Sequence, residues 1–320
     1  MPGITDLQVN GFKGVDFQRD DISPAELCLA AMGLRQTGCS SFLATLITAP
    51  FQTILHRLRH LKALRASDPF LREMIAGWHV EGPFLSDKPG YHGAHDPSFM
   101  EDPSPAKIRA LRKAGGDLPM LLTLAPERRG AEASIREATR LGMGVSLGHT
   151  QATTGQIERA MDAGATGFTH LGNGCPQSWD RHDNILWRVL EQPGLRVGLI
   201  PDAIHVSPAL FRILHRVIDP SRFWYVTDAM AAAGMAPGRY PLAGAELEVG
   251  RDQVVRKPGS ELFAGSALTP LDGVWRAAWM LGSTWQETWP RFSTQPAEWM
   301  ALSNSLRPGA PRPVLVREEK

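Results

Sequence analysis

The sequence predicts an α/β fold of the (β/α)8 barrel type, because short apolar segments alternate with longer segments of helical periodicity. Eight segments of strand length are expected to form the barrel: Ile4–Val9, Ser41–Leu46, Met74–Val80, Met120–Leu124, Gly144–Leu147, Gly167–His170, Arg196–Ile200 and Phe223–Thr227. The alternative is an open, doubly wound sheet. Such a sheet normally carries a glycine-rich phosphate-binding turn after its first strand, and Gly11-Phe12-Lys13-Gly14 does not match that pattern.

Helices are predicted between most of these strands, because apolar residues recur there every three or four positions. They are expected at Ala25–Gln36, Phe51–Leu64, Ser134–Leu141, Thr154–Ala163 and Pro208–Val217, and helical periodicity returns at Asp272–Leu281. Ser23-Pro24 is a helix-start signal, and Gly38 and Gly164 mark helix ends. Residues 240–262 are rich in glycine and alternate in hydrophobicity, which predicts a β-hairpin inserted after the eighth strand. We expect a single barrel domain over residues 1–320.

The composition is that of an ordinary globular protein, with 43% hydrophobic and 21% charged residues. A formal net charge of +1 provides no electrostatic basis for binding nucleic acid or an anionic membrane, so neither partner is expected. No apolar stretch is long enough to span a bilayer, and Asp6 interrupts any apolar run where a secretory leader would stand. Cys28, Cys39 and Cys175 show no metal-ligand or redox spacing, which suits a reducing compartment, so we expect a cytoplasmic protein.

Carboxylate and imidazole side chains recur where the predicted strands end. At or just after strands three, five, six, seven and eight stand, in order, Glu81, His149, His170, His205 and Asp228. A carboxylate at the end of a buried strand is unfavourable unless a partner compensates its charge. In a (β/α)8 barrel the carboxyl ends of all strands meet on one face, where active sites form. These side chains are therefore expected to meet in one site.

Two imidazoles and one carboxylate from this group would suit a catalytic metal ion, because they leave a coordination position open. An ion such as Zn²⁺ lowers the pKa of water at that position and so provides a nucleophile near neutral pH. Asp228 is then suited to act as general base for that water and as general acid for the leaving group. A single histidine at a strand end more often has a structural role. The joint occurrence of Glu81, His149, His170 and Asp228 favours a catalytic role.

The same residues belong to motifs that follow one another in a fixed order. The motifs are His79–Phe84, Gly148-His149-Thr150, Thr169-His170-Leu171 with Asn173, Asp202–His205, Thr227-Asp228-Ala229 and Gly265-Ser266-Ala267-Leu268-Thr269. This ordered set resembles the N-acetylglucosamine-6-phosphate deacetylases, a branch of the amidohydrolase superfamily, over nearly the whole chain. The resemblance implies a (β/α)8 barrel of the metal-dependent amidohydrolase type.

The resemblance also implies a role for each matched residue. Glu81, His149 and His170 would bind one divalent metal ion, with zinc favoured over iron, cobalt or nickel. Asp228 would be the catalytic acid and base, and His95 would contact the amide carbonyl of the substrate. The residues that match substrate contacts are Asn173, Gly174, Arg181 and His205. His205 would contact the sugar and the other three the phosphate. The family often supplies the arginine across a dimer interface, so a homodimer is expected.

The chain departs from the wider superfamily in three places. Gln8-Val9-Asn10 stands where many amidohydrolases carry His-x-His, which argues for one metal ion rather than two. The segment after the sixth strand, Asn173-Gly174-Cys175, and the loop at 176–184 differ from the family pattern and fall in the substrate pocket. The small β-sandwich of the family is predicted to be missing or vestigial, because the chain starts close to its first barrel strand and little sequence follows Pro308.

The predicted reaction is metal-dependent deacetylation of N-acetylglucosamine 6-phosphate, or a close N-acetyl amino-sugar phosphate, to acetate and the amino sugar phosphate. Two alternatives remain open. The same chemistry could act on another N-acyl substrate, such as an N-acyl amino acid or an unphosphorylated sugar. The barrel could also be non-catalytic and serve only for binding.

Overall fold

Eight parallel strands form the centre of the computed structural model, which describes residues 2–259 and 263–302. They pair in the order in which they follow in the chain, and their bounds are β1 Ile4–Val9, β4 Cys39–Ile47, β5 Ile75–Glu81, β6 Met120–Leu124, β7 Gly144–Leu147, β8 Gly167–Phe168, β9 Arg196–Leu199 and β10 Phe223–Tyr225. Each predicted strand corresponds to one of them. The sheet closes where Val9 and Ala229 form a parallel bridge and the backbone N–H of Asn10 donates to the Ala229 carbonyl at 2.7 Å. The predicted (β/α)8 barrel is confirmed, and the open sheet is wrong.

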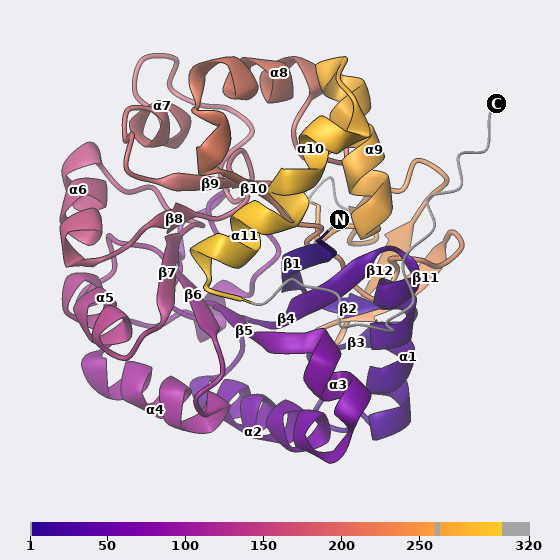
Figure 1. The fold of residues 1–320 in the computed structure, drawn as a ribbon. Helices are drawn as coiled ribbons and strands as arrows, with labels where there is room; N and C mark the ends of the chain where they lie inside the picture. The colour runs from indigo at the N-terminus through magenta and orange to yellow at the C-terminus, as the bar shows by residue number, and fades with distance from the viewer. Residues whose placement is uncertain (1, 260–262, 303–320) are drawn as a thin grey trace.

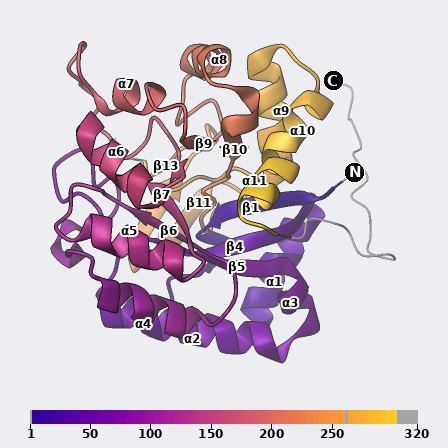
Figure 2. The same cartoon turned by 60° about the vertical axis from the view of Figure 1, so that its left-hand side comes forward.

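Helices surround the strands on the outside of the barrel (Figure 1). Their bounds are α1 Pro24–Gln36, α2 Phe51–Ser67, α3 Pro69–Met74, α4 Pro105–Gly115, α5 Ala131–Arg140, α6 Thr154–Ala163, α7 Ile185–Leu190, α8 Pro208–Val217, α9 Pro270–Leu281, α10 Trp285–Phe292 and α11 Thr294–Trp299. Ser23 and Thr153 start α1 and α6 with reciprocal capping boxes, and Gly164 ends α6 in the left-handed conformation. Figure 2 shows α2, α4, α5 and α6 following one another around the barrel. Among the helices of the described residues, none has both the length and the apolar character that crossing a membrane requires.

The amino-terminal end of the barrel is covered by the last two described helices. The indole of Trp289, in α10, donates to the Pro2 carbonyl at 2.8 Å. Trp299, at the end of α11, packs its ring 4.3 Å from that of Trp224 and donates to the Thr166 hydroxyl at 3.0 Å. These contacts lie at the starts of β1, β8 and β10, so the opposite, carboxyl-terminal end of the barrel is the end available for a site.

Two small antiparallel sheets accompany the barrel. Strands β2 Gly11–Phe12 and β3 Val15–Asp16 form a short pair directly after β1. Strands β11 Gly238–Leu242, β12 Ala245–Val249 and β13 Val255–Arg256 form a three-stranded sheet. The hairpin predicted at 240–262 overlaps the antiparallel pair β11 and β12, and the structure adds a third strand, β13. Residues 260–262 of the predicted hairpin lie outside the described part of the chain. That the small β-sandwich is missing or vestigial stays a prediction, because the segment after Pro308 also lies outside the described residues.

Candidate active site

Three residues of the predicted site share an uncommon backbone conformation. His149, His170 and Asp228 follow β7, β8 and β10, and their φ angles are +50°, +30° and +52°. Positive φ is uncommon for residues other than glycine, because the Cβ atom crowds the backbone, and such strained residues cluster at functional sites. In this barrel each of them turns the chain out of its strand and directs its side chain to the same cavity.

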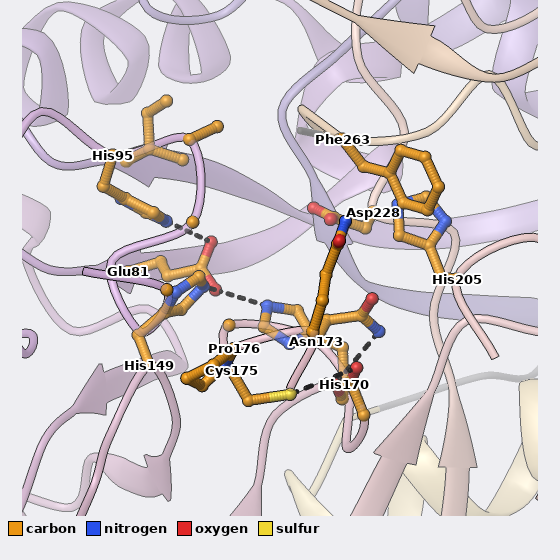
Figure 3. A pocket seen from close by; sticks show the side chains of 18 of the residues that line it. Glu81, His95, His149, His170, Asn173, Cys175, Pro176, His205, Asp228 and Phe263 are labelled. Carbon is orange, nitrogen blue, oxygen red and sulfur yellow. Dashed lines mark hydrogen bonds and ion pairs between the residues drawn. The ribbon is translucent and has the colours of Figure 1, made fainter. Parts of the chain in front are cut away.

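The carboxylate of Glu81 lies between imidazoles at the base of this cavity (Figure 3). Its Oε1 atom is 2.9 Å from Nε2 of His170 and 3.4 Å from Nε2 of His149, while its Oε2 atom is 3.8 Å from Nε2 of His95. All four side chains are buried. Burial opposes ionisation of Glu81, yet its hydrogen bond with His170 holds the pKa of the carboxyl well below its usual value. The structure therefore brings the three predicted metal ligands into direct contact.

The ring of His149 is oriented by a backbone carbonyl. Its Nδ1 atom lies 2.9 Å from the Tyr91 carbonyl oxygen, which can only accept a hydrogen bond, so Nδ1 carries the hydrogen. In the neutral ring the Nε2 lone pair then faces the Glu81 carboxylate at 3.4 Å. Two electron-rich atoms facing each other in a buried site favour a cation between them. The donor set thus fits a divalent metal ion of the kind that imidazole and carboxylate ligands bind.

Two glycines leave room for the ring of His149. A Cβ atom at Gly174 would lie 2.6 Å from Nδ1 of His149, and one at Gly93 would lie 3.0 Å from its Cε1 atom. Both glycines have φ angles of +59°, which glycine adopts without strain. Gly174, expected as a substrate contact, lines the cavity and also packs against a predicted metal ligand.

The side-chain amide of Gln8 connects Asp228 to Glu81. The sequence showed Gln8 only as a residue that replaces a histidine ligand of other amidohydrolases. The Nε2 group of Gln8 donates to Glu81 Oε2 at 3.1 Å and to Asp228 Oδ1 at 3.0 Å. The Nδ2 group of Asn10 donates to the same Asp228 oxygen at 2.7 Å. Burial, followed by the negative charge of Glu81, raises the pKa of Asp228 to about 6. A carboxyl group with such a pKa can both accept and release a proton near neutral pH.

His95 reaches the cavity from the loop that follows β5. Its Nδ1 atom lies 2.9 Å from the Thr48 hydroxyl and 3.4 Å from the Thr48 backbone nitrogen. Burial lowers the pKa of His95 to about 3, so the ring is neutral. Thr48 follows β4 in the chain and was not identified from the sequence, since no motif marks it.

Glu81, His95 and His149 form a cluster in which one potential ligand atom from each residue lies within 4.8 Å of the others. This cluster is compatible with a metal site. It contains two of the three predicted ligands and has His95 where the prediction has His170. His170 nonetheless makes the shorter contact with Glu81, at 2.9 Å against 3.8 Å for His95.

The cavity above Glu81 has a volume of about 280 Å³ and opens between loops from both halves of the chain. Asn173, Gly174 and His205, the predicted substrate contacts, line it. His205 donates from Nδ1 to Asp202 at 2.6 Å and stacks edge-on with Phe263, their ring centroids 5.2 Å apart. Phe263 also lines the cavity and was not predicted.

Arg181 is placed apart from the other predicted residues. Its side chain is exposed and does not line the cavity, and its carbonyl accepts a hydrogen bond from the Trp187 indole at 3.2 Å. Within residues 2–259 and 263–302, no lysine or arginine lines the cavity. A phosphate bound there would meet backbone and neutral side-chain donors from this chain, with Arg181 outside the cavity.

Comparison with known proteins shows strong similarity to one group of enzymes, although no family model matches the chain. It is 31% identical to an N-acetylglucosamine-6-phosphate deacetylase of Vibrio furnissii over 96% of this chain and 75% of that protein. It is 33% identical to an N-acetylgalactosamine-6-phosphate deacetylase of Escherichia coli O157:H7 over 96% of this chain and 80% of that protein. An N-acetylglucosamine-6-phosphate deacetylase of Danio rerio is 35% identical over 78% of this chain. The match spans 62% of that relative's length.

A solved structure agrees with the sequence comparison. An N-acetyl-D-glucosamine-6-phosphate deacetylase from Mycobacterium smegmatis, an aspartate-to-alanine mutant in complex with N-acetyl-D-glucosamine-6-phosphate, superposes with a TM-score of 0.85. The two chains are 32% identical, and the match covers 94% of this chain and 77% of the other.

Proposed function

Because this chain belongs to the N-acetylglucosamine-6-phosphate deacetylase family, we propose that it hydrolyses the acetamide of an N-acetyl amino-sugar 6-phosphate. N-acetylglucosamine 6-phosphate is the leading substrate, and its galactosamine epimer is the close relative that the family's names include. The products are acetate and the amino sugar phosphate. The observation that carries this proposal is the pair of buried carboxylates that line the cavity, Glu81 among imidazoles and Asp228 with a pKa of about 6, both of which accept a hydrogen bond from Gln8.

One divalent metal ion is proposed as the cofactor, held by Glu81, His149 and His170. Zinc is the preferred ion, with iron, cobalt and nickel as alternatives, because all of them accept imidazole and carboxylate ligands. When bound, such an ion supplies Lewis acidity, polarising the acetyl carbonyl and lowering the pKa of a water molecule. Support for a single ion comes from Gln8 and Asn10, whose amide groups donate to the carboxylates and leave no histidine pair on β1 for a second ion.

Asp228 is proposed to move the proton that the reaction requires. As a carboxylate it accepts a proton from the attacking water while the new carbon–oxygen bond forms at the acetyl carbon. It then delivers this proton to the amide nitrogen as the carbon–nitrogen bond breaks, so that acetate and the free amine leave. The hydrogen bonds from Gln8 and Asn10 both reach Oδ1, which leaves Oδ2 as the oxygen for this transfer.

His95 is proposed to stabilise the negative charge that develops on the acetyl oxygen. Its ring is neutral at physiological pH and buried, so a hydrogen on Nε2 would be a fixed donor in a site of low polarity. The sugar is proposed to contact His205 and to lie near Phe263, both of which line the cavity.

The phosphate is proposed to bind at Asn173 and Gly174 and to meet Arg181 of a second copy of the chain. Support for a homodimer comes from the exposed position of Arg181 beside the half-exposed indole of Trp187, and from the absence of a cationic side chain among the described residues of the cavity. Arginine suits this role because its guanidinium binds phosphate oxygens in a bidentate manner.

The three cysteines, which form no disulfide within the described residues, support a cytoplasmic location.

A panel of substrates tests the proposed function and separates its alternatives. Zinc-loaded protein is incubated with the 6-phosphates of N-acetylglucosamine and N-acetylgalactosamine, with unphosphorylated N-acetylglucosamine and with an N-acetyl amino acid, and acetate is measured. A kcat/KM at least 100-fold higher for a 6-phosphate is expected. A preference for either unphosphorylated compound would replace the proposed substrate. No acetate from any of them, with metal bound, would favour the non-catalytic barrel.

A further inference from the structure

The hydrogen on the His95 ring can be located from its neighbours. The backbone N–H of Thr48 donates to Nδ1 of His95 at 3.4 Å, and a backbone N–H can only donate. Nδ1 therefore carries no hydrogen, and the Thr48 hydroxyl, 2.9 Å from the same atom, donates as well. The hydrogen of the neutral ring must then be on Nε2, which faces the cavity and lies 3.8 Å from Glu81 Oε2.

His149 has the opposite tautomer although its ring lies beside that of His95. The two ring centroids are 4.5 Å apart, yet the Tyr91 carbonyl accepts from Nδ1 of His149, so the neutral form of this ring has its hydrogen on Nδ1 and a bare Nε2. A metal ligand needs a bare nitrogen, whereas a group that stabilises an oxyanion needs a hydrogen. The protein therefore prepares two neighbouring imidazoles for different tasks through the group bound to each Nδ1 atom.

Room for the Thr48 hydroxyl is provided by the residue next to Glu81. A Cβ atom at Gly82 would collide with Oγ1 of Thr48, and Gly82 adopts a φ angle of +90° that glycine accepts without strain. Thr48 itself is buried, with 5% of its surface exposed, so water does not compete for its hydroxyl. The contact between Thr48 and His95 is thus supported by the packing around it.

We infer that Thr48 is a positioning residue that holds His95 as the Nε2–H tautomer and thereby makes it a hydrogen-bond donor to the substrate's acetyl carbonyl. The same contact keeps His95 from serving as a metal ligand, although one of its ring nitrogens lies within 4.8 Å of ligand atoms of Glu81 and His149. This inference rests on the proposed function for the identity of the acceptor, but the tautomer itself does not depend on catalysis.

Substitutions at Thr48 test the inference through kinetics. Thr48→Val removes the hydroxyl and keeps the shape, and it is expected to lower kcat about tenfold while KM stays within twofold. Thr48→Ser keeps a hydroxyl and should stay within threefold of the wild type. In a His95→Ala background, Thr48→Val should have no further effect, because its action passes through the ring.

Thr288→Val is the matched control, since Thr288 is buried in α10 and its hydroxyl donates to backbone carbonyls far from the cavity. It should leave kcat unchanged in both backgrounds. A Thr48→Val enzyme as fast as the wild type would overturn the inference. An equal loss with and without His95 would also overturn it, because the effect would then be structural.

Two measurements on ¹⁵N-histidine-labelled and metal-loaded protein decide the question without activity. Long-range ¹H–¹⁵N spectra should show hydrogen on Nε2 of His95 and on Nδ1 of His149. Metal content should stay near one equivalent in His95→Asn and fall in His149→Asn. Hydrogen on Nδ1 of His95, or loss of the metal in His95→Asn, would overturn the inference. A wild-type protein that releases no acetate but shows the expected tautomers would count against the proposed function alone.

Discussion

Gly174→Ala should weaken metal binding without touching a ligand. The new methyl group would lie 2.6 Å from Nδ1 and 2.9 Å from Cγ of His149, whereas an ordinary contact begins near 3.4 Å. Relief of this contact requires the ring to move by about 0.8 Å. Such a shift disturbs both the bond from Nδ1 to the Tyr91 carbonyl and the position of Nε2 opposite Glu81.

The size of the effect follows from two separate contributions. Alanine at a φ angle of +59° destabilises the fold by about 1–2 kcal/mol, because the left-handed region is unfavourable for residues with a Cβ atom. Disturbing the hydrogen bond that orients a histidine ligand lowers metal affinity roughly 10- to 100-fold. Only the second contribution should appear in the dissociation constant of the metal, since the first acts on the whole fold.

Competition with a chromogenic chelator measures the zinc dissociation constant, and Gly282→Ala is the matched control. Gly282 has a nearly identical φ angle of +62°, and a Cβ atom there meets no heavy atom within 4 Å. Both variants should lose the stability set by the left-handed backbone in urea unfolding, with a further loss in Gly174→Ala from its contact with His149, but only Gly174→Ala should lose zinc affinity. If Gly174→Ala binds zinc as tightly as Gly282→Ala does, the reasoning about the glycine contact is refuted.

Three further predictions concern Asp228, Arg181 and His215. Asp228→Asn is expected to lower kcat about 10³-fold with normal zinc content, since a positioned acid–base group contributes roughly 10²- to 10⁴-fold. A variant that keeps more than a tenth of wild-type turnover would contradict the acid–base role of Asp228. Arg181→Ala should raise KM for the 6-phosphate at least tenfold and leave hydrolysis of the unphosphorylated sugar unchanged, because a charged hydrogen bond contributes about 1.5–3 kcal/mol. Equal KM values for the variant and the wild type would contradict phosphate binding by Arg181. Burial lowers the pKa of His215 to about 4, so below about pH 6.5 this residue binds more protons in the unfolded chain than in the folded one. His215 alone should therefore contribute a fall of about 2 kcal/mol in the free energy of unfolding between pH 7 and pH 4.5. His215→Gln cannot titrate and should reduce this fall in urea unfolding measured across that range, whereas an unchanged pH dependence would refute the assignment.

The barrel was predictable because its strands and its longest helices carry clear periodic patterns. Five helices of the described residues were missed: α3, α4, α7, α10 and α11. Of these, α3, α7 and α11 have six residues each and are too short to show a period. The sixth strand was predicted to reach His170, but β8 ends at Phe168 because His170 already adopts a left-handed conformation. That early end is a consequence of the site, so no strand pattern could reveal it.

The centre of the site was predictable for a different reason. Glu81 ends a strand, and His149 and Asp228 stand just after two others; the carboxyl ends of these strands must converge in a closed barrel, so the proximity of the three residues follows from topology. Thr48 and Phe263 act through tertiary contacts, with His95 and His205 respectively, and neither belongs to a recognisable motif. Gln8 and Asn10 were visible in the sequence as departures from a pattern, but the bonds of Gln8 to both carboxylates and of Asn10 to Asp228 could be found only from the structure.

The most direct test is a metal titration of the apoprotein in the presence of N-acetylglucosamine 6-phosphate. Zinc is added in steps to chelator-treated protein, and the initial rate of acetate release is plotted against equivalents of metal. We expect a rate near zero without metal, a linear rise and a break at one equivalent, as one ion at Glu81, His149 and His170 requires. Full activity without metal, a break at two equivalents, or no acetate at any metal content would contradict the central claim.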